Sequence, residues 1–228
     1  MQPIVIFGAG GHGREVLQLI ADINRASLAA GLAPVWDCRG FLVDTDYLAG
    51  APSMVGGLPV LGDLAWLAAH PEAQVVVALG APAARRRVVA RIRAQGENGF
   101  PVLVHPRAWI GERVTLGVGT LVCAGAMLTT DIQVGAHVHL NVACTLAHDD
   151  VLEDFVTLSP GVHVAGNVLL EEGAELGTGC AVIPRCTVGK WSVLGAGAVV
   201  TNDIDADCTA VGAPARSVKC RAPGWHLA

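Results

Sequence analysis

Residues 164–200 read VAGNVLLEEGAELGTGCAVIPRCTVGKWSVLGAGAVV, with an aliphatic residue at every sixth position. The same spacing extends back to Val104 without a miss. Four positions after each aliphatic residue, most hexads carry a small or β-branched residue, and Asp150 clearly breaks this second pattern. Such a repeat is typical of a parallel β-helix, in which three hexads make one triangular coil. The aliphatic positions are Val104, Ile110, Leu116, Val122, Leu128, Val134, Leu140, Leu146, Leu152, Leu158, Val164, Leu170, Leu176, Val182, Val188, Leu194 and Val200.

The repeat also predicts dimensions. Residues eighteen apart should stack at the ~4.8 Å spacing of neighbouring strands. The hexads then give between five and six coils, with no room for an inserted loop. Because the preceding residues lack this periodicity, we predict two domains: an α/β domain over residues 1–103 and a β-helix over residues 104–228.

The first hundred residues begin with a strand, a glycine turn and a helix. Ile4–Phe7 reads as a buried parallel strand, and helical spacing runs from Arg14 to Ile20. Such a turn lets backbone N–H groups and the helix N-terminus approach a phosphate. The turn consists of Gly8, Ala9, Gly10, Gly11, His12 and Gly13.

Two further strands are expected over residues 40–44 and 74–80, ending at Asp44 and Gly80, and a helix over residues 83–95. Ligands of open α/β sheets lie beyond the carboxyl ends of the strands. We therefore expect the glycine turn, Asp44 and Gly80 to line a nucleotide pocket; a purely structural α/β cap is the alternative. The short domain favours a mononucleotide or a nucleotide-sugar over NAD.

Composition excludes several classes of partner. The 228 residues carry a net charge of −5 and no basic run, which disfavours nucleic acid. Nothing is typical of a targeting segment, and no apolar stretch is long enough to cross a bilayer. The 7 cysteines form no C-x-x-C pair, and their odd number argues against a complete disulfide framework. We expect core-filling cysteines and a cytoplasmic protein.

One segment of the repeat carries the chemistry expected of a general base. His148 comes two residues after the inward Leu146, which places it at a corner, and Asp149 and Asp150 follow. A neighbouring carboxylate orients an imidazole and favours its protonated form. Gly166, one coil above, would offer a backbone N–H to the oxyanion of acyl transfer. The alternatives are a solvated surface histidine and a glycine that the turn requires.

Three other histidines of the repeat, His137, His139 and His163, raise a zinc site as a rival. The eighteen-residue stacking places His139 two coils below Glu175, and His163 on Thr145. No three-histidine cluster follows, so we expect no metal.

As a set, several motifs resemble the nucleotide-sugar and sialic acid acetyltransferase family, whose members include N-acetyltransferases of UDP-4-amino-sugars and of GDP-perosamine. The resemblance covers nearly the whole chain. It rests on GAGGHG (8–13), FLVD (41–44), VVALG (76–80), LVHP (103–106), AHDD (147–150), SPGVHVAGN (159–167), VLGAGAVV (193–200) and VGAPAR (211–216).

The resemblance implies a nucleotide-holding N-terminal domain, a left-handed β-helix that binds acetyl-CoA as co-substrate, and a homotrimer with sites at the subunit interfaces. It makes His148 the catalytic base and Asp149 its acidic neighbour. One departure is Thr157, where family members often have a second histidine that His139, one coil below, would partly replace. The implied coenzyme-binding residues are Thr157, Gly166, Gly177, Gly195 and Arg216.

We therefore expect acetyl transfer from acetyl-CoA to the amine of a nucleotide-linked amino sugar, with His148 removing the proton. O-acetylation of a sialic acid or a related sugar is the nearest alternative. A non-catalytic nucleotide-sugar-binding protein is the third.

Overall fold

The computed structural model describes residues 1–96 and 98–227. Contacts within the chain divide it into two compact units, one of Met1–Gly80 with Ala84–Pro106 and one of Arg107–Ala228 with Ala81–Ala83. The assignment of substrates to the two predicted domains stays a prediction.

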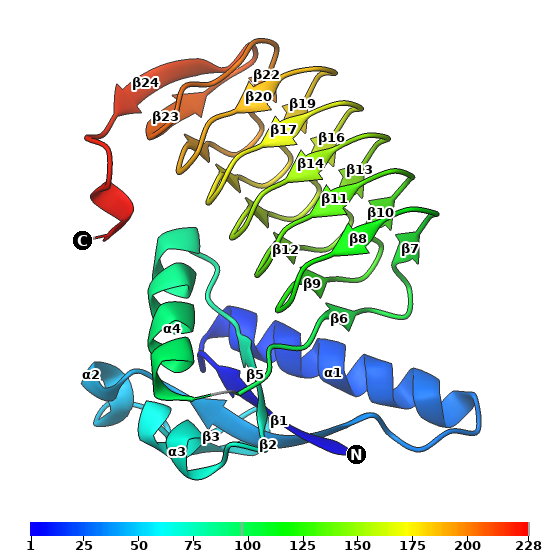
Figure 1. Ribbon diagram of the computed structural model, residues 1–228, viewed down its shortest axis with the longest axis vertical. Helices are drawn as coiled ribbons and strands as arrows, with labels where there is room; N and C mark the ends of the chain where they lie inside the picture. Colours follow the sequence, from blue (N-terminus) through cyan, green and yellow to red (C-terminus); the bar gives the residue numbers. More distant parts are fainter. Residues whose placement is uncertain (97, 228) are drawn as a thin grey trace. The chain divides into compact units, whose positions relative to one another are not determined.

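The N-terminal unit is an α/β domain built on one sheet, with the strand order β3-β4-β2-β1-β5 (Figure 1). The β1–β2, β1–β5 and β2–β4 pairs are parallel, and β3 is antiparallel to β4. The strands are β1 (Gln2–Phe7), β2 (Trp36–Leu42), β3 (Met54–Val55), β4 (Leu58–Gly62) and β5 (Gln74–Val77). The helices are α1 (Gly11–Ala29), α2 (Thr45–Leu48), α3 (Leu64–Ala69) and α4 (Pro82–Gln95).

The predicted strands and helices of this unit are confirmed, but their ends differ: α1 continues to Ala29, well beyond the predicted Ile20, and β2 begins at Trp36, before the predicted residue 40. β1 lies between β2 and β5, and its apolar residues Ile4, Val5 and Ile6 are fully buried. The predicted strands over residues 40–44 and 74–80 end earlier, at Leu42 and Val77. Asp44 and Gly80 therefore lie in the loops that follow the strands.

The C-terminal unit is a left-handed parallel β-helix, as predicted. Its two-residue strands recur every six residues, and they stack with the expected shift of eighteen, for example Met127 on Thr145. The strands are β7 (Trp109–Ile110), β8 (Thr115–Leu116), β9 (Leu121–Val122), β10 (Met127–Leu128), β11 (Gln133–Val134), β12 (His139–Leu140), β13 (Thr145–Leu146), β14 (Val151–Leu152), β15 (Thr157–Leu158), β16 (His163–Val164), β17 (Leu169–Leu170), β18 (Glu175–Leu176), β19 (Ala181–Val182), β20 (Thr187–Val188), β21 (Val193–Leu194) and β22 (Val199–Val200). The preceding strand of the repeat, β6 (Leu103–Val104), belongs to the N-terminal unit.

Three sheets form the faces of the prism. The first contains β7, β10, β13, β16, β19 and β22; the second contains β8, β11, β14, β17 and β20; the third runs from β9 through β12, β15, β18 and β21 to β23 and β24. The hexad residues Leu128, Leu140, Leu158 and Leu170 are fully buried, so aliphatic side chains fill the interior. A ligand of this unit must therefore bind on its outer surface.

Each corner of the prism connects two neighbouring sheets. The histidine corner, residues 129–132, 147–150 and 165–168, joins the first sheet to the second. The threonine corner, residues 117–120, 135–138 and 171–174, joins the second to the third. The glycine corner, residues 177–180 and 195–198, joins the third to the first.

The chain ends in a hairpin of β23 (Cys208–Val211) and β24 (Arg216–Cys220), followed by the short helix η1 (Trp225–Leu227). Cys208 and Cys220 face each other across the hairpin and form a disulfide, which the odd cysteine count did not lead us to expect. The other five cysteines, all among the described residues, form no disulfide, and Cys144, Cys180 and Cys186 are buried in the core. Among the described residues, no helix combines the length and the apolar character needed to cross a membrane.

Candidate active site

The N-terminal unit contains a cavity of about 910 Å³ at the carboxyl ends of its strands. This volume suits a small organic ligand. The loops after β1, β2 and β5 line it together with α4, so the three predicted strand ends do meet. Of the residues predicted to bind the nucleotide, it is lined by Gly8, Gly10, Gly11, His12, Asp44 and Gly80.

The three glycines of the G-x-G-x-x-G turn have different roles. A Cβ on Gly13 would lie 1.9 Å from the carbonyl oxygen of Gly8, and a Cβ on Gly8 would lie 2.8 Å from that of Ala78. Both positions therefore exclude a side chain, and Gly13 is not among the residues lining the cavity. Gly10, by contrast, has open space around it and precedes the first turn of α1. The N–H groups of that turn have no partner within the helix, which suits an anion.

Asp44 lies in the cavity wall as an ion pair with Arg91 of α4. Its Oδ1 accepts a second hydrogen bond from Arg91 Nη2 at 3.1 Å, so the contact is bidentate. The guanidinium holds the pKa of Asp44 below its usual value. Arg91 was not predicted from the sequence, and neither were Arg87 and Tyr47, which line the same cavity. The spacing of four between the two arginines, which puts them on one helix face, was the available signal.

His148 and Asp149 occupy the histidine corner on the outside of the prism. Nδ1 of His148 lies 2.7 Å from Oδ2 of Asp149, and the two side chains are 59% and 55% exposed. An ionised carboxylate only accepts hydrogen bonds, so Nδ1 carries the proton in this pair. Nε2 is then left with its lone pair, which is the form that a general base requires.

Gly166 stacks directly above His148. A Cβ at Gly166 would lie 2.6 Å from Nε2 and from Cε1 of the ring, so the imidazole occupies the space that a side chain would fill. The next residue donates its N–H to the carbonyl of His148 at 2.9 Å, which fixes the two coils to each other. The structure therefore brings together the predicted base and the predicted backbone donor.

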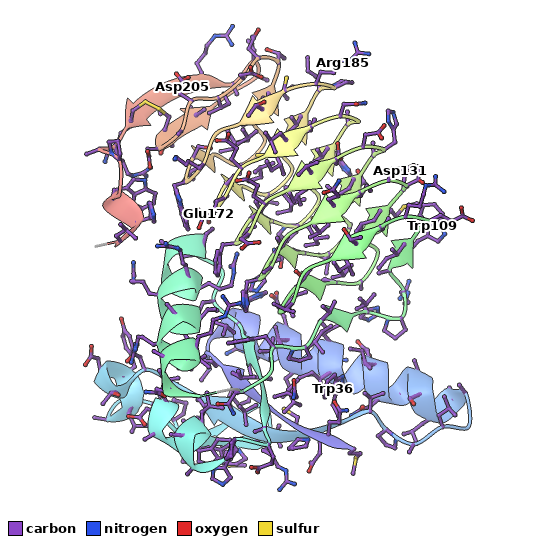
Figure 2. All side chains as sticks on the ribbon, viewed as in Figure 1. Trp36, Trp109, Asp131, Glu172, Arg185 and Asp205 are labelled. Atoms are coloured by element: carbon purple, nitrogen blue, oxygen red, sulfur yellow. A yellow bond between two sulfur atoms is a disulfide. The ribbon has the colours of Figure 1, made fainter. Side chains whose placement is uncertain are left out.

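A polar cluster lies below His148, with Thr130 and Asp131 one coil down and Arg113 two coils down. Arg113 donates to Asp131 from Nε at 2.5 Å and from Nη2 at 2.9 Å, and to Thr130 Oγ1 at 3.0 Å. The arginine lowers the pKa of Asp131 to about 2. Figure 2 shows Asp131 on the same edge of the prism as Arg185, the edge to which the histidine corner belongs. Because its pKa is low, Asp131 stays ionised below His148.

Asp150 is a fully buried acid of the same corner. Its Oδ2 accepts from the N–H of Ala147 and its Oδ1 from the N–H of Val168, both at 3.0 Å. Burial raises its pKa to about 7 despite these hydrogen bonds.

The other residues implied for coenzyme binding follow the third sheet. Thr157 lies on β15, is 4% exposed, and pairs in register with His139 below and Glu175 above. Gly177 and Gly195 follow β18 and β21 at the glycine corner, and the exposed Arg216 begins β24. Within one chain, these residues do not share the corner of His148.

The three histidines of the rival zinc site are separated as the stacking predicted. His163 pairs in register with Thr145, and its Nδ1 lies 2.9 Å from the threonine hydroxyl. His137 is buried and stacks on Phe155 with a centroid distance of 5.3 Å. Across the described residues, no group of three or more histidine, cysteine or acidic side chains is arranged to hold a metal.

The chain is similar to a known domain family and to known enzymes. Residues 3–92 match the PglD N-terminal domain family. The chain is 31% identical over 221 residues to GDP-perosamine N-acetyltransferase of Escherichia coli O157:H7, covering 94% of this chain and 95% of that enzyme.

Two solved structures are similar over nearly their full lengths. The acetyltransferase domain of PglB from Neisseria gonorrhoeae FA1090, in complex with acetyl coenzyme A, is 32% identical with a TM-score of 0.81, covering 95% of this chain and 99% of that domain. PerB from Caulobacter crescentus, in complex with CoA and GDP-perosamine, is 29% identical with a TM-score of 0.81, covering 95% of this chain and 97% of that one.

Proposed function

We propose that this chain, which belongs to the family of hexapeptide-repeat nucleotide-sugar N-acetyltransferases, moves the acetyl group of acetyl-CoA to the amine of a nucleotide-linked amino sugar. The observation that carries the proposal is the 2.7 Å contact between His148 Nδ1 and Asp149 Oδ2, beside Gly166, on an open corner. The resulting tautomer leaves Nε2 unprotonated where a substrate amine can reach it.

In the proposed reaction, the amine nitrogen attacks the thioester carbonyl carbon. His148 Nε2 takes the proton that the nitrogen loses, and Asp149 stabilises the imidazolium. The developing oxyanion accepts a hydrogen bond from the Gly166 N–H, which donates to no acceptor among the described residues. The C–S bond then breaks, and the thiolate of coenzyme A receives the proton from His148.

A direct transfer suits the cysteines of this chain. An acyl-enzyme route would need a thiolate near the base. Cys144 is the cysteine nearest to His148 in sequence, but it is buried and its pKa is raised to about 11. Burial also raises the pKa of Cys180 and Cys186. These three thiols stay protonated, which favours direct transfer with both substrates bound.

The cavity of the N-terminal unit is the proposed nucleotide site. The first turn of α1 supplies N–H groups for a phosphate. Arg91, and with it Arg87 on the same helix, supplies positive charge, and Tyr47 supplies an exposed aromatic ring at the cavity. This combination suits the diphosphate and base of a nucleotide-sugar.

A homotrimer is part of the proposal. The base and Gly166 lie at the histidine corner, whereas the implied coenzyme residues Gly177 and Gly195 lie at the glycine corner, so a complete site needs a second chain. Trp109, labelled in Figure 2, and its register partner Met127 support this, because they are neighbours on the first sheet and remain 54% and 48% exposed. Closed symmetry covers such a face in every subunit.

A thiol-release assay tests the reaction. The protein is supplied with acetyl-CoA and a panel of UDP-, GDP- and dTDP-amino sugars, each beside its 4-hydroxy counterpart, and with a free sialic acid. We expect release with one or more amino sugars. Release with the hydroxyl sugars or with the sialic acid alone would establish O-acetylation. Binding of acetyl-CoA and a nucleotide-sugar without release would establish the non-catalytic alternative.

A further inference from the structure

Asp150 interrupts the hexad pattern at a position that is small or β-branched in most other hexads. It is fully buried, and a buried carboxylate costs more free energy than a valine of similar volume. Hydrophobic packing therefore gives no reason for an acid here. Burial is also what raises its pKa to about 7.

The hydrogen bonds of Asp150 join two coils. One carboxylate oxygen accepts from Ala147, the residue before His148. The other accepts from Val168, two residues after Gly166. One side chain thus holds the turn that carries the proposed base and the turn that carries the proposed oxyanion donor.

The glycine corner holds the equivalent N–H in a different way. Cys180 and Ala198 each donate to a carbonyl three residues earlier in their own turn, at 3.1 Å. At Val168 the N–H goes instead to Asp150 of the coil below. The geometry of the Gly166 turn therefore depends on the acid.

We propose that Asp150 is a positioning residue for the transfer reaction, whose carboxylate fixes the Gly166 turn relative to His148. The inference rests on the proposed roles of those two residues. Reacting groups must be held closely, because a misplacement of about 1 Å costs on the order of 100-fold in rate. His148 and Asp149 are both more than half exposed, so they contribute little rigidity of their own.

Thr120 offers a matched control. It occupies the same hexad position, is fully buried, and bridges coils in the same way: its Oγ1 accepts from the N–H of Val138 at 3.3 Å and donates to the carbonyl of Gly135 at 2.9 Å. It belongs to the threonine corner, away from His148. Figure 2 shows Glu172, another member of that corner, apart from the edge of Asp131.

The test compares Asp150→Val, Asp150→Asn and Thr120→Val in the full chain. We expect Asp150→Val to lower kcat by about 10–100-fold with the acceptor that gives the fastest thiol release, while the KM for acetyl-CoA changes less than 3-fold. Asp150→Asn keeps one acceptor oxygen, so its loss should be smaller; it also carries the test if the valine variant does not fold. Thr120→Val should keep wild-type kcat.

A second readout does not depend on turnover. The imidazole signals of His148 in ¹H–¹³C NMR, assigned by their loss in His148→Asn, should shift in Asp150→Val and stay in place in Thr120→Val. If no acceptor is acetylated, the proposed function fails while this readout still reports on positioning. Unchanged His148 signals in both Asp150 variants, or equal changes in Thr120→Val, would overturn the inference.

Discussion

Replacement of Gly166 by alanine should disable the site while leaving the fold intact. The new Cβ would lie 2.6 Å from Nε2 and Cε1 of His148 and 3.0 Å from Nδ1. Ordinary contacts begin at 3.4 Å, so the ring has to move by roughly 1 Å. The backbone N–H stays in place, which makes this substitution a selective perturbation of the base.

The expected size of the effect follows from the exposure of the ring. The side chain of His148 is 59% exposed and can rotate into solvent, so the free energy of unfolding should change by less than about 1 kcal/mol. The proton transfer, by contrast, depends on where Nε2 lies. We expect kcat to fall on the order of 100-fold.

A double-mutant cycle provides the assay. Thiol release is measured for wild type, Gly166→Ala, His148→Ala and the double variant, and thermal unfolding is recorded for each. If the alanine acts through the ring, it should cost less than 3-fold once His148 is absent, because the two changes share one mechanism. A Gly166→Ala enzyme within 2-fold of wild type, or an equal loss in the His148→Ala background, would refute the reasoning.

Asp44→Ala should raise the KM for the nucleotide-sugar about 10-fold, because the bidentate contact with Asp44 no longer holds Arg91 in the cavity wall. Acetyl-CoA binding in calorimetry should stay unchanged, and an equal loss for both ligands would point to a folding defect. Asp150 has a folded pKa of about 7 against an ordinary 3.8, so between these pH values the native state binds a proton that the unfolded state does not. The free energy of unfolding should therefore rise by about 2 kcal/mol as the pH falls from 7 to 5. Urea unfolding should show that Asp150→Asn lacks this gain, and an identical pH dependence in both proteins would contradict the raised pKa. Light scattering should give a trimer, and mixed trimers of a His148→Ala chain and a Gly195→Trp chain should regain activity; a fully active monomer would contradict the shared site.

The hexads made most of the β-helix predictable from the sequence. Each aliphatic residue faces inward and each coil takes eighteen residues, so the stacking of Gly166 on His148 followed from numbering alone. The glycine turn and the strand ends were predictable for a similar reason, since periodicity and glycine chemistry are local properties.

The remaining features depend on contacts between distant parts of the chain. The pairing of Asp44 with Arg91 needs α4 to pack beside the end of β2, and the Cys208–Cys220 disulfide needs the register of the β23–β24 hairpin. Neither follows from local spacing. Asp150 was visible as a break in the pattern, but its hydrogen bonds to two coils appear only in three dimensions.

The most direct test of the central claim is His148→Asn with a nucleotide-linked amino sugar as acceptor. Asparagine keeps a polar side chain at the corner but cannot take a proton at neutral pH. We expect kcat to fall by about 10²–10⁴-fold, the range for loss of a general base. The dissociation constant of acetyl-CoA, measured by calorimetry, should stay within 3-fold. Turnover within a few-fold of wild type would contradict the assignment of His148 as the base.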